Sequence, residues 1–155
     1  MLAVILKREY LMKLIFGIAL SVLLTGCMNV NTIEAVKASG TVNVVASNSS
    51  TTEVEEAIFN YFQKCYKSSS VKMDGNNYGE TLSVSKQKKS GVTEIIVKNI
   101  LYKGPHHFLI VSIASENGAT NITSYAATSR GESAFEKISE IAKGISPDKC
   151  PGSIL

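Results

Sequence analysis

The hydrophobic pattern from Thr41 onward predicts one small domain of strands and helices. Residues Thr41–Ser47 (TVNVVAS) alternate in the two-residue period of a strand, with Val42, Val44 and Ala46 on one face. From Val54 to Cys65 the apolar positions then recur in steps of three and one, which places them along one side of a helix. The spacing of Thr52 and Glu55 predicts a capping box at the start of this helix.

The middle of the chain predicts an antiparallel meander. Its connections are short, so neighbouring strands are expected to pair antiparallel. Asn117-Gly118 predicts a type I′ turn, because both residues tolerate positive φ. Residues Met73–Gly79 (MDGNNYG) are expected to form a loop. The four expected strands are Glu80–Lys86, Val92–Leu101, His106–Ser115 and Thr120–Ala127.

Strict alternation in the third of these strands predicts a central position in the sheet. His107 and Leu109 would face one side, and Phe108 and Ile110 the other. A strand covered on both faces has this composition.

A second helix is expected at the end of the chain. Its apolar stripe runs from Phe135 to Ile145, and Ser133 with Glu136 repeats the capping-box spacing. The predicted fold class is α+β, with two layers: an antiparallel sheet of about five strands and two helices on one face. The predicted order is β-α-β-β-β-β-α.

Composition separates the first 26 residues from the rest of the chain. The chain has 155 residues, 16 Lys+Arg and 13 Asp+Glu. Residues 1–26 contain three of the bases and one of the acids, so 129 residues remain with 13 bases, 12 acids and a net charge of +1. That length suits a single domain. The near-neutral charge argues against a nucleic-acid partner, which normally needs a clustered basic surface.

The apolar run in this N-terminal segment is typical of an export signal. Leu14–Leu24 (LIFGIALSVLL) is 11 residues long and follows Lys13. A spanning helix needs roughly 20 apolar residues, whereas a basic flank, a short apolar stretch and small residues are typical of a secretory signal. Both Met1 and Met12 remain open as the start of the protein.

The sequence Leu24-Thr25-Gly26-Cys27 closes the apolar run. It resembles the lipobox of bacterial lipoproteins, in which an aliphatic residue and two small residues precede a lipidated cysteine. The resemblance implies cleavage before Cys27, a diacylglyceryl group on its thiol, and often an acyl chain on its new amino group. Two or three chains anchor a protein firmly without spanning the membrane. The alternative is an ordinary signal peptide followed by a chance cysteine.

The resemblance also predicts a location and a division of the chain. In lipoproteins of two-membrane bacteria an aspartate after the lipidated cysteine favours the inner membrane, and here the residue is Met28. We therefore expect an envelope protein on the outer membrane, facing the periplasm. The expected parts are a signal peptide at 1–26, lipidated Cys27 with a flexible tether to residue 40, and a single domain at 41–155. An additional strand or helix packed on the domain is the alternative to the tether.

Once Cys27 is assigned to lipid, Cys65 and Cys150 remain as one even pair. Export would place them where disulfides persist, and a bond would connect the two helices. Two unpaired thiols or a redox centre are the alternatives, although no CxxC spacing supports the latter. The arrangement resembles small bacterial lipoprotein domains with a cysteine late in the first helix bonded to one near the C-terminus. In element order it also resembles the helix-grip domains of outer-membrane assembly lipoproteins.

Reactive motifs are scarce. His106 and His107 are adjacent on a strand, so they would point to opposite faces, which disfavours a shared metal. The loop at Asp74 lacks the alternating acids of a calcium site, and no GxSxG, SxxK or P-loop spacing occurs. We therefore expect no enzyme activity, cofactor or metal. Lys86, Lys88 and Lys89 lie near an expected hairpin tip, where they form either a contact surface or an ordinary solvated turn.

Two functions fit these observations. The first is a non-enzymatic module that binds another envelope protein or supports an assembly, with membrane attachment through Cys27. The second is a carrier or sensor of a small apolar ligand held between sheet and helices.

Overall fold

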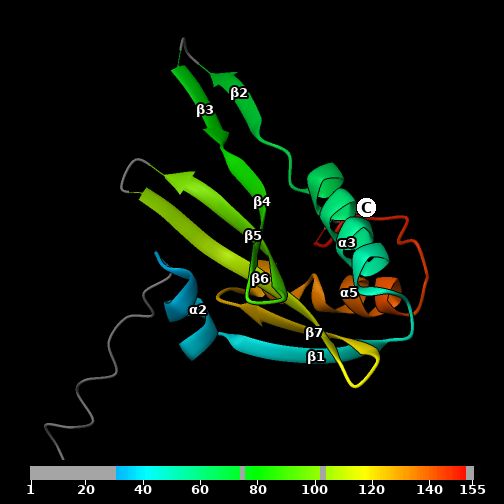
Figure 1. Cartoon of the computed structure of the whole chain (residues 1–155). Helices are drawn as coiled ribbons and strands as arrows, with labels where there is room; N and C mark the ends of the chain where they lie inside the picture. The colour runs from blue at the N-terminus through cyan, green and yellow to red at the C-terminus, as the bar shows by residue number, and fades with distance from the viewer. Residues whose placement is uncertain (1–30, 74–75, 102–103, 153–155) are drawn as a thin grey trace, which may run out of the picture.

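The computed structural model of the protein describes residues 31–73, 76–101 and 104–152. Its centre is one antiparallel sheet in the order β1-β7-β6-β5-β4, which confirms the predicted α+β class (Figure 1). The strands are β1 (Thr41–Ser47), β4 (Leu82–Lys89), β5 (Val92–Leu101), β6 (Gly104–Glu116) and β7 (Ala119–Ala126). Within the described ranges no helix is long and apolar enough to cross a membrane.

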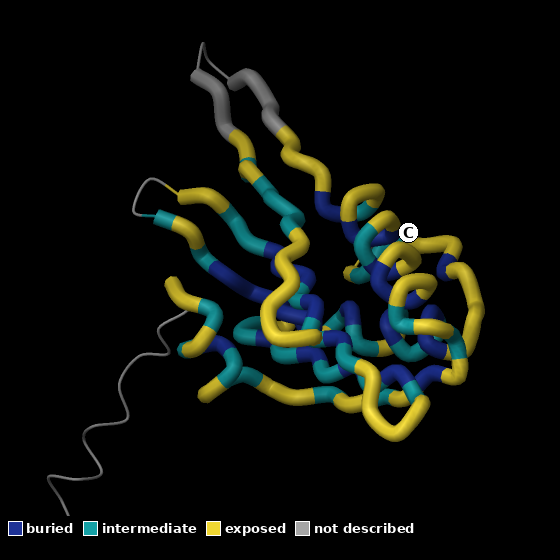
Figure 2. The backbone as a smooth tube through the Cα atoms, viewed as in Figure 1, coloured by how far each residue is buried: buried dark blue, intermediate teal, exposed yellow. Residues whose placement is uncertain are grey.

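Helices α3 (Thr51–Cys65) and α5 (Phe135–Ala142) cover one face of the sheet. The main core lies between these helices and the inner face of the strands, as the buried residues in Figure 2 show. Phe62 and Ile58 of α3 and Ile138 of α5 are all 0% exposed, and they pack against Leu109 and Val111 of β6. The two predicted helices therefore enclose the core with the sheet.

A third helix, α2 (Ile33–Ser39), replaces most of the expected tether. Val36 of this helix is fully buried and packs against Ile110, whose side chain lies on the sheet face opposite that of Leu109. Thr32 caps the helix by accepting a hydrogen bond from the Ala35 amide. The prediction of a flexible tether is thus wrong for these residues, because a helix of about two turns suffices to bury Val36 on the second face.

The structure also forms a hairpin where a loop was predicted. Strands β2 (Ser69–Met73) and β3 (Asn76–Glu80) pair antiparallel and project from the body of the protein (Figure 1). The order of elements in the predicted domain is otherwise kept, with a short helix α4 (Ser129–Glu132) before α5.

Both predicted capping boxes are wrong in detail. The N-cap of helix α3 is Ser50, which exchanges capping hydrogen bonds with Glu53. Glu55, the expected partner of Thr52, is instead buried and accepts a hydrogen bond of 2.6 Å from the Thr93 hydroxyl.

At the second helix, the Ser133 hydroxyl donates to the carbonyl of Arg130 (2.7 Å), and α5 has no side-chain cap. The capping bond belongs to α4, where the Thr128 hydroxyl accepts from the Gly131 amide at 3.4 Å.

A bulge changes the expected alternation of β6. Val97 of β5 pairs with Leu109, whereas Lys98 pairs with His107, so Phe108 is an extra residue. Phe108 consequently joins Leu109 in the main core rather than Ile110 on the other face. The predicted Asn117-Gly118 turn is confirmed, with φ of 52° and 81°.

We expect acidic pH to destabilise the packing of α2 on the sheet. Burial acts to raise the pKa of the Glu94 carboxyl, but hydrogen bonds from Lys37 of α2 and from Gln87 outweigh it, so this pKa lies below its ordinary 4.5. A depressed pKa contributes stability that is complete above the unfolded value and is lost as pH falls through the folded value. Hydrogen exchange of α2 should therefore accelerate as pH falls below 4.5, after correction for intrinsic exchange. In Glu94→Gln that acid-dependent step should vanish. An unchanged step in the variant would contradict the assignment.

Candidate functional site

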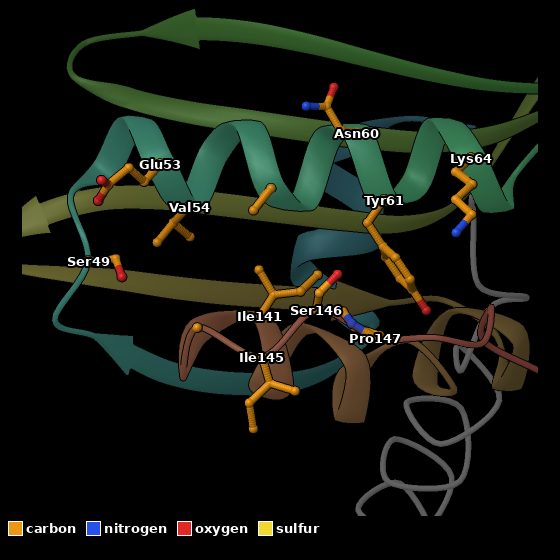
Figure 3. A pocket seen from close by; sticks show the side chains of 12 residues that line it. Ser49, Glu53, Val54, Asn60, Tyr61, Lys64, Ile141, Ile145, Ser146 and Pro147 are labelled. Carbon is orange, nitrogen blue, oxygen red and sulfur yellow. The ribbon is translucent and has the colours of Figure 1, made fainter.

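A groove of about 470 Å³ lies between α3 and the end of α5 (Figure 3). Its volume falls within the roughly 300–1,000 Å³ typical of small-molecule sites. One wall is a stripe along α3, and the other is the end of α5 with the segment that follows it. The lining residues are Ser49, Glu53, Val54, Ala57, Asn60, Tyr61, Lys64, Ile141, Gly144, Ile145, Ser146 and Pro147.

The α3 wall exists because the groove stripe lies beside the core stripe of the same helix. Val54 and Tyr61 belong to both, since they are buried in the core and also line the groove. Ala57 is exposed between them. Its small side chain leaves the middle of the wall shallow, and the centre of this wall is apolar.

A helix C-terminal motif builds the opposite wall. The Ile145 amide donates to the carbonyl of Glu140 (3.0 Å), and the Gly144 amide donates to that of Ile141 (2.9 Å). These bonds form a Schellman motif, which needs a left-handed residue that glycine supplies at φ 78°. The turn leaves the Ile145 side chain 53% exposed at the groove.

The C-terminal segment is hydrogen-bonded to a residue that lines the groove. The Tyr61 hydroxyl donates to the carbonyl of Lys149 at 2.7 Å. Burial, and secondarily the negative charge of Glu140, raises the pKa of Tyr61 to about 12, so this hydroxyl remains a donor at physiological pH. Next to it the predicted disulfide between Cys65 and Cys150 is confirmed, with a Cα–Cα distance of 5.3 Å.

The charged groups of the groove lie at the two ends of its α3 wall, with the polar side chain of Asn60 between them. Glu53 is near the start of α3, and hydrogen bonds from the side chain and backbone of Ser50 lower the pKa of its carboxyl. Lys64 is near the C-terminus of the same helix. An elongated ligand with an apolar middle therefore matches the walls better than a compact polar one does.

The three lysines of the predicted contact surface divide between the two faces of β4. Lys86 extends over the ring of Phe59 on α3 (5.2 Å), and Lys88 lies 3.9 Å from the carboxylate of Glu55. Lys89 follows on the other face, as alternation requires. All three are exposed, but the structure does not bring them together into one patch.

The two histidines occupy successive positions of β6. His106 pairs with Asn99, and His107 with Lys98, where it is 7% exposed. Among the residues that the structure describes, no group of three or more His, Cys, Asp or Glu could hold a metal. Cys27 and Asp74 lie outside the described residues.

A second polar arrangement, not predicted from the sequence, lies where the hairpin joins the body. One Nη of Arg130 in α4 donates to both carboxylate oxygens of Glu80 at 2.5 and 2.6 Å, and the guanidinium lies 5.2 Å from the Phe108 ring. The Asn99 amide nitrogen also donates to Glu80, at 2.7 Å. Burial raises the pKa of the nearby Tyr66, and the positive charge of Arg130 partly offsets this rise. These residues are 9 to 64 positions apart, so only the fold reveals their association.

The groove was missed for a different reason. Its lining on α3 has helical spacing that was visible in the sequence, but its second wall depends on the turn at Gly144. Comparison of the chain with protein-family models, with curated proteins and with solved structures matched none of them.

Proposed function

We propose that this protein is a bacterial envelope lipoprotein, anchored in the outer membrane through lipid on Cys27 and facing the periplasm. Its domain would act as a non-enzymatic module that binds another envelope protein or supports an assembly. The observation that carries the proposal is the sequence Leu24-Thr25-Gly26-Cys27, which directly follows an apolar run of 11 residues.

The confirmed disulfide supports export. Bonds such as that between Cys65 and Cys150 form and persist in oxidising compartments and are rare in the cytosol of mesophiles. The bond is compatible with any exported protein, so it supports the compartment rather than the lipid. The lipid requires its own test.

Substitution of Cys27 provides that test. The full chain should incorporate a labelled fatty acid and sediment with membranes. The Cys27→Ala variant should carry no label and should no longer be found in the membrane fraction that detergent extracts. Cys65→Ala serves as the matched control, since it removes a cysteine of the folded domain but should keep the label. Persistent labelling of Cys27→Ala would contradict the proposal.

Met28→Asp should move the protein toward the inner membrane in a density gradient.

Cross-linking in intact cells tests the binding role. Affinity capture of the full chain should enrich a discrete envelope protein, and Cys27→Ala should lose it. Lys86, Lys88 and Lys89 are the predicted contacts, and their triple replacement by glutamine should reduce capture. Because Lys89 lies on a different face from the other two, single variants would show which side of β4 makes the contact. Unchanged capture by the triple variant would remove this surface from the proposal.

A second function, carriage of a small apolar ligand, is favoured by the groove. The groove lies between α3 and the segment after α5, outside the expected space between sheet and helices. Native mass spectrometry of the detergent-solubilised protein should then show a retained small molecule. Ala57→Phe, at an exposed groove position, should expel it, while Lys64→Gln should preserve the apolar contacts. A spectrum with no additional mass in the unmodified protein would count against this function.

A further inference from the structure

One edge of the sheet lacks the features that normally keep an edge strand unpaired. Among the strands that the structure describes, β1 is the last on its side and pairs with β7 alone. Its seven residues, TVNVVAS, contain no charge and no proline, and its pairing with β7 runs through seven consecutive positions without a bulge. Edges of this kind are templates for further strand pairing.

The opposite edge shows the contrast. Strand β4 ends in Lys86, Lys88 and Lys89, all exposed, and lysines on an edge oppose association. On β1, by comparison, Val42 is 51% and Val44 64% exposed, on the sheet face that does not contact α5. The two edges of one sheet are therefore chemically unlike, and only β1 offers an uncharged surface.

We propose that β1 pairs with β1 of a second copy of this chain, to give one continuous ten-stranded antiparallel sheet across a two-fold axis. The face of β1 that carries Val42, Val44 and Ala46, all exposed, is self-complementary about Val44. Antiparallel pairing centred there places Val44 opposite Val44 and Val42 opposite Ala46. All six side chains lie on the same face, because directly opposed residues share a face. A two-fold interface requires this kind of self-complementarity.

Charged residues near the two ends of β1 also fit antiparallel pairing of two β1 strands. At the Thr41 end, Glu132 of α4 accepts a hydrogen bond of 2.5 Å from the Thr41 hydroxyl. At the Ser47 end, the Ser47 hydroxyl donates to the carbonyl of Ala142 at 2.7 Å, and the next residue is Lys143. Antiparallel pairing brings the Thr41 end of one copy to the Ser47 end of the other.

Each two-fold pair thus juxtaposes Glu132 of one copy with Lys143 of the other, twice. Both residues are exposed. A parallel arrangement would instead oppose like charges. This complementarity favours a second copy over an unrelated strand, and it does not depend on the lipid anchor or on the proposed function.

Cysteine cross-linking of the full chain in membranes tests the register. Val44→Cys should form a covalent dimer with mild oxidant or a short bifunctional maleimide, because opposed Cβ atoms lie within about 5.5 Å. Val42→Cys is the matched control on the same strand and face. Two copies of Cys at position 42 would be offset by about 13 Å along the strands, so dimer yield should fall on the order of tenfold. Co-expressed Val42→Cys and Ala46→Cys chains, with different tags, should cross-link to each other.

A charge swap tests the pairing through residues that lie outside the strand. With Val44→Cys as the reporter, Glu132→Lys or Lys143→Glu should reduce the dimer, and the two together should restore it. Equal yields at positions 42 and 44, or no dimer at either, would overturn the proposal. A covalent adduct to a different protein would also overturn it, by showing that the edge pairs with another partner.

Discussion

Replacement of Cys65 and Cys150 by alanine together should lower the free energy of unfolding by about 4 kcal/mol. The bond joins residues 85 positions apart, and closing so long a loop removes much of the entropy of the unfolded chain. For a domain of this size the loss corresponds to a fall in Tm of roughly 10–20 °C. Thermal unfolding of the purified protein, followed by circular dichroism, measures it.

Reduction of the unmodified protein supplies the control. The reduced protein should unfold near the temperature of the double variant, because both lack the same constraint. A variant whose Tm matches that of the oxidised protein would show that the cross-link adds little to stability. Loss of the disulfide should also weaken the hydrogen bond between Tyr61 and the C-terminal segment, since Cys150 directly follows Lys149, whose carbonyl accepts that bond.

The features that could be predicted from the sequence are those fixed by local chemistry. The bounds of β1, the Asn117-Gly118 turn and the apolar stripe of α3 all follow from period or from a required backbone conformation. The disulfide was also predictable, because only two cysteines remained after Cys27 was assigned. In each case the residues concerned allow few other backbone conformations or pairings.

The features that were missed depend on contacts across the fold. Helix α2 has only seven residues, and its identity as a packed element rests on Val36 meeting Ile110. The bulge at Phe108 reverses a strand pattern that strict alternation had predicted. The capping box is formed by Ser50 and Glu53, whereas Glu55 is buried and bonded to Thr93. Sequence periodicity does not show which of several possible partners a residue contacts in the folded protein.

The candidate sites follow the same division. Lys86, Lys88 and Lys89 were grouped because they are close in sequence, but alternation along β4 separates Lys89 from the other two. The groove needs the turn at Gly144 to place its second wall, and the ion pair between Arg130 and Glu80 connects residues 50 positions apart. Residues that meet only in the fold therefore have to be found there.

Gly131→Ala should be strongly destabilising, by roughly 3 kcal/mol or more. A Cβ atom at this position would lie 2.2 Å from the carbonyl oxygen of Phe108 and 3.0 Å from the Cβ of Ala126. The oxygen cannot retreat easily, because it accepts the Ala127 amide hydrogen bond at 3.1 Å beside the bulge. Relief therefore requires α4 to move away from β6 and β7. That movement would also disturb the contact of Arg130 with the Phe108 ring.

Gly118→Ala is the matched control for this effect. A Cβ there would meet nothing within 4 Å, so its cost is limited to the positive φ of 81°, about 1 kcal/mol. Urea unfolding of both variants measures the difference. Equal losses would mean that α4 adapts without cost and that the close approach is not rigid. A much larger loss for Gly131→Ala would show that the Phe108 bulge and α4 form one tightly packed unit, with glycine as the residue that lets their backbones meet.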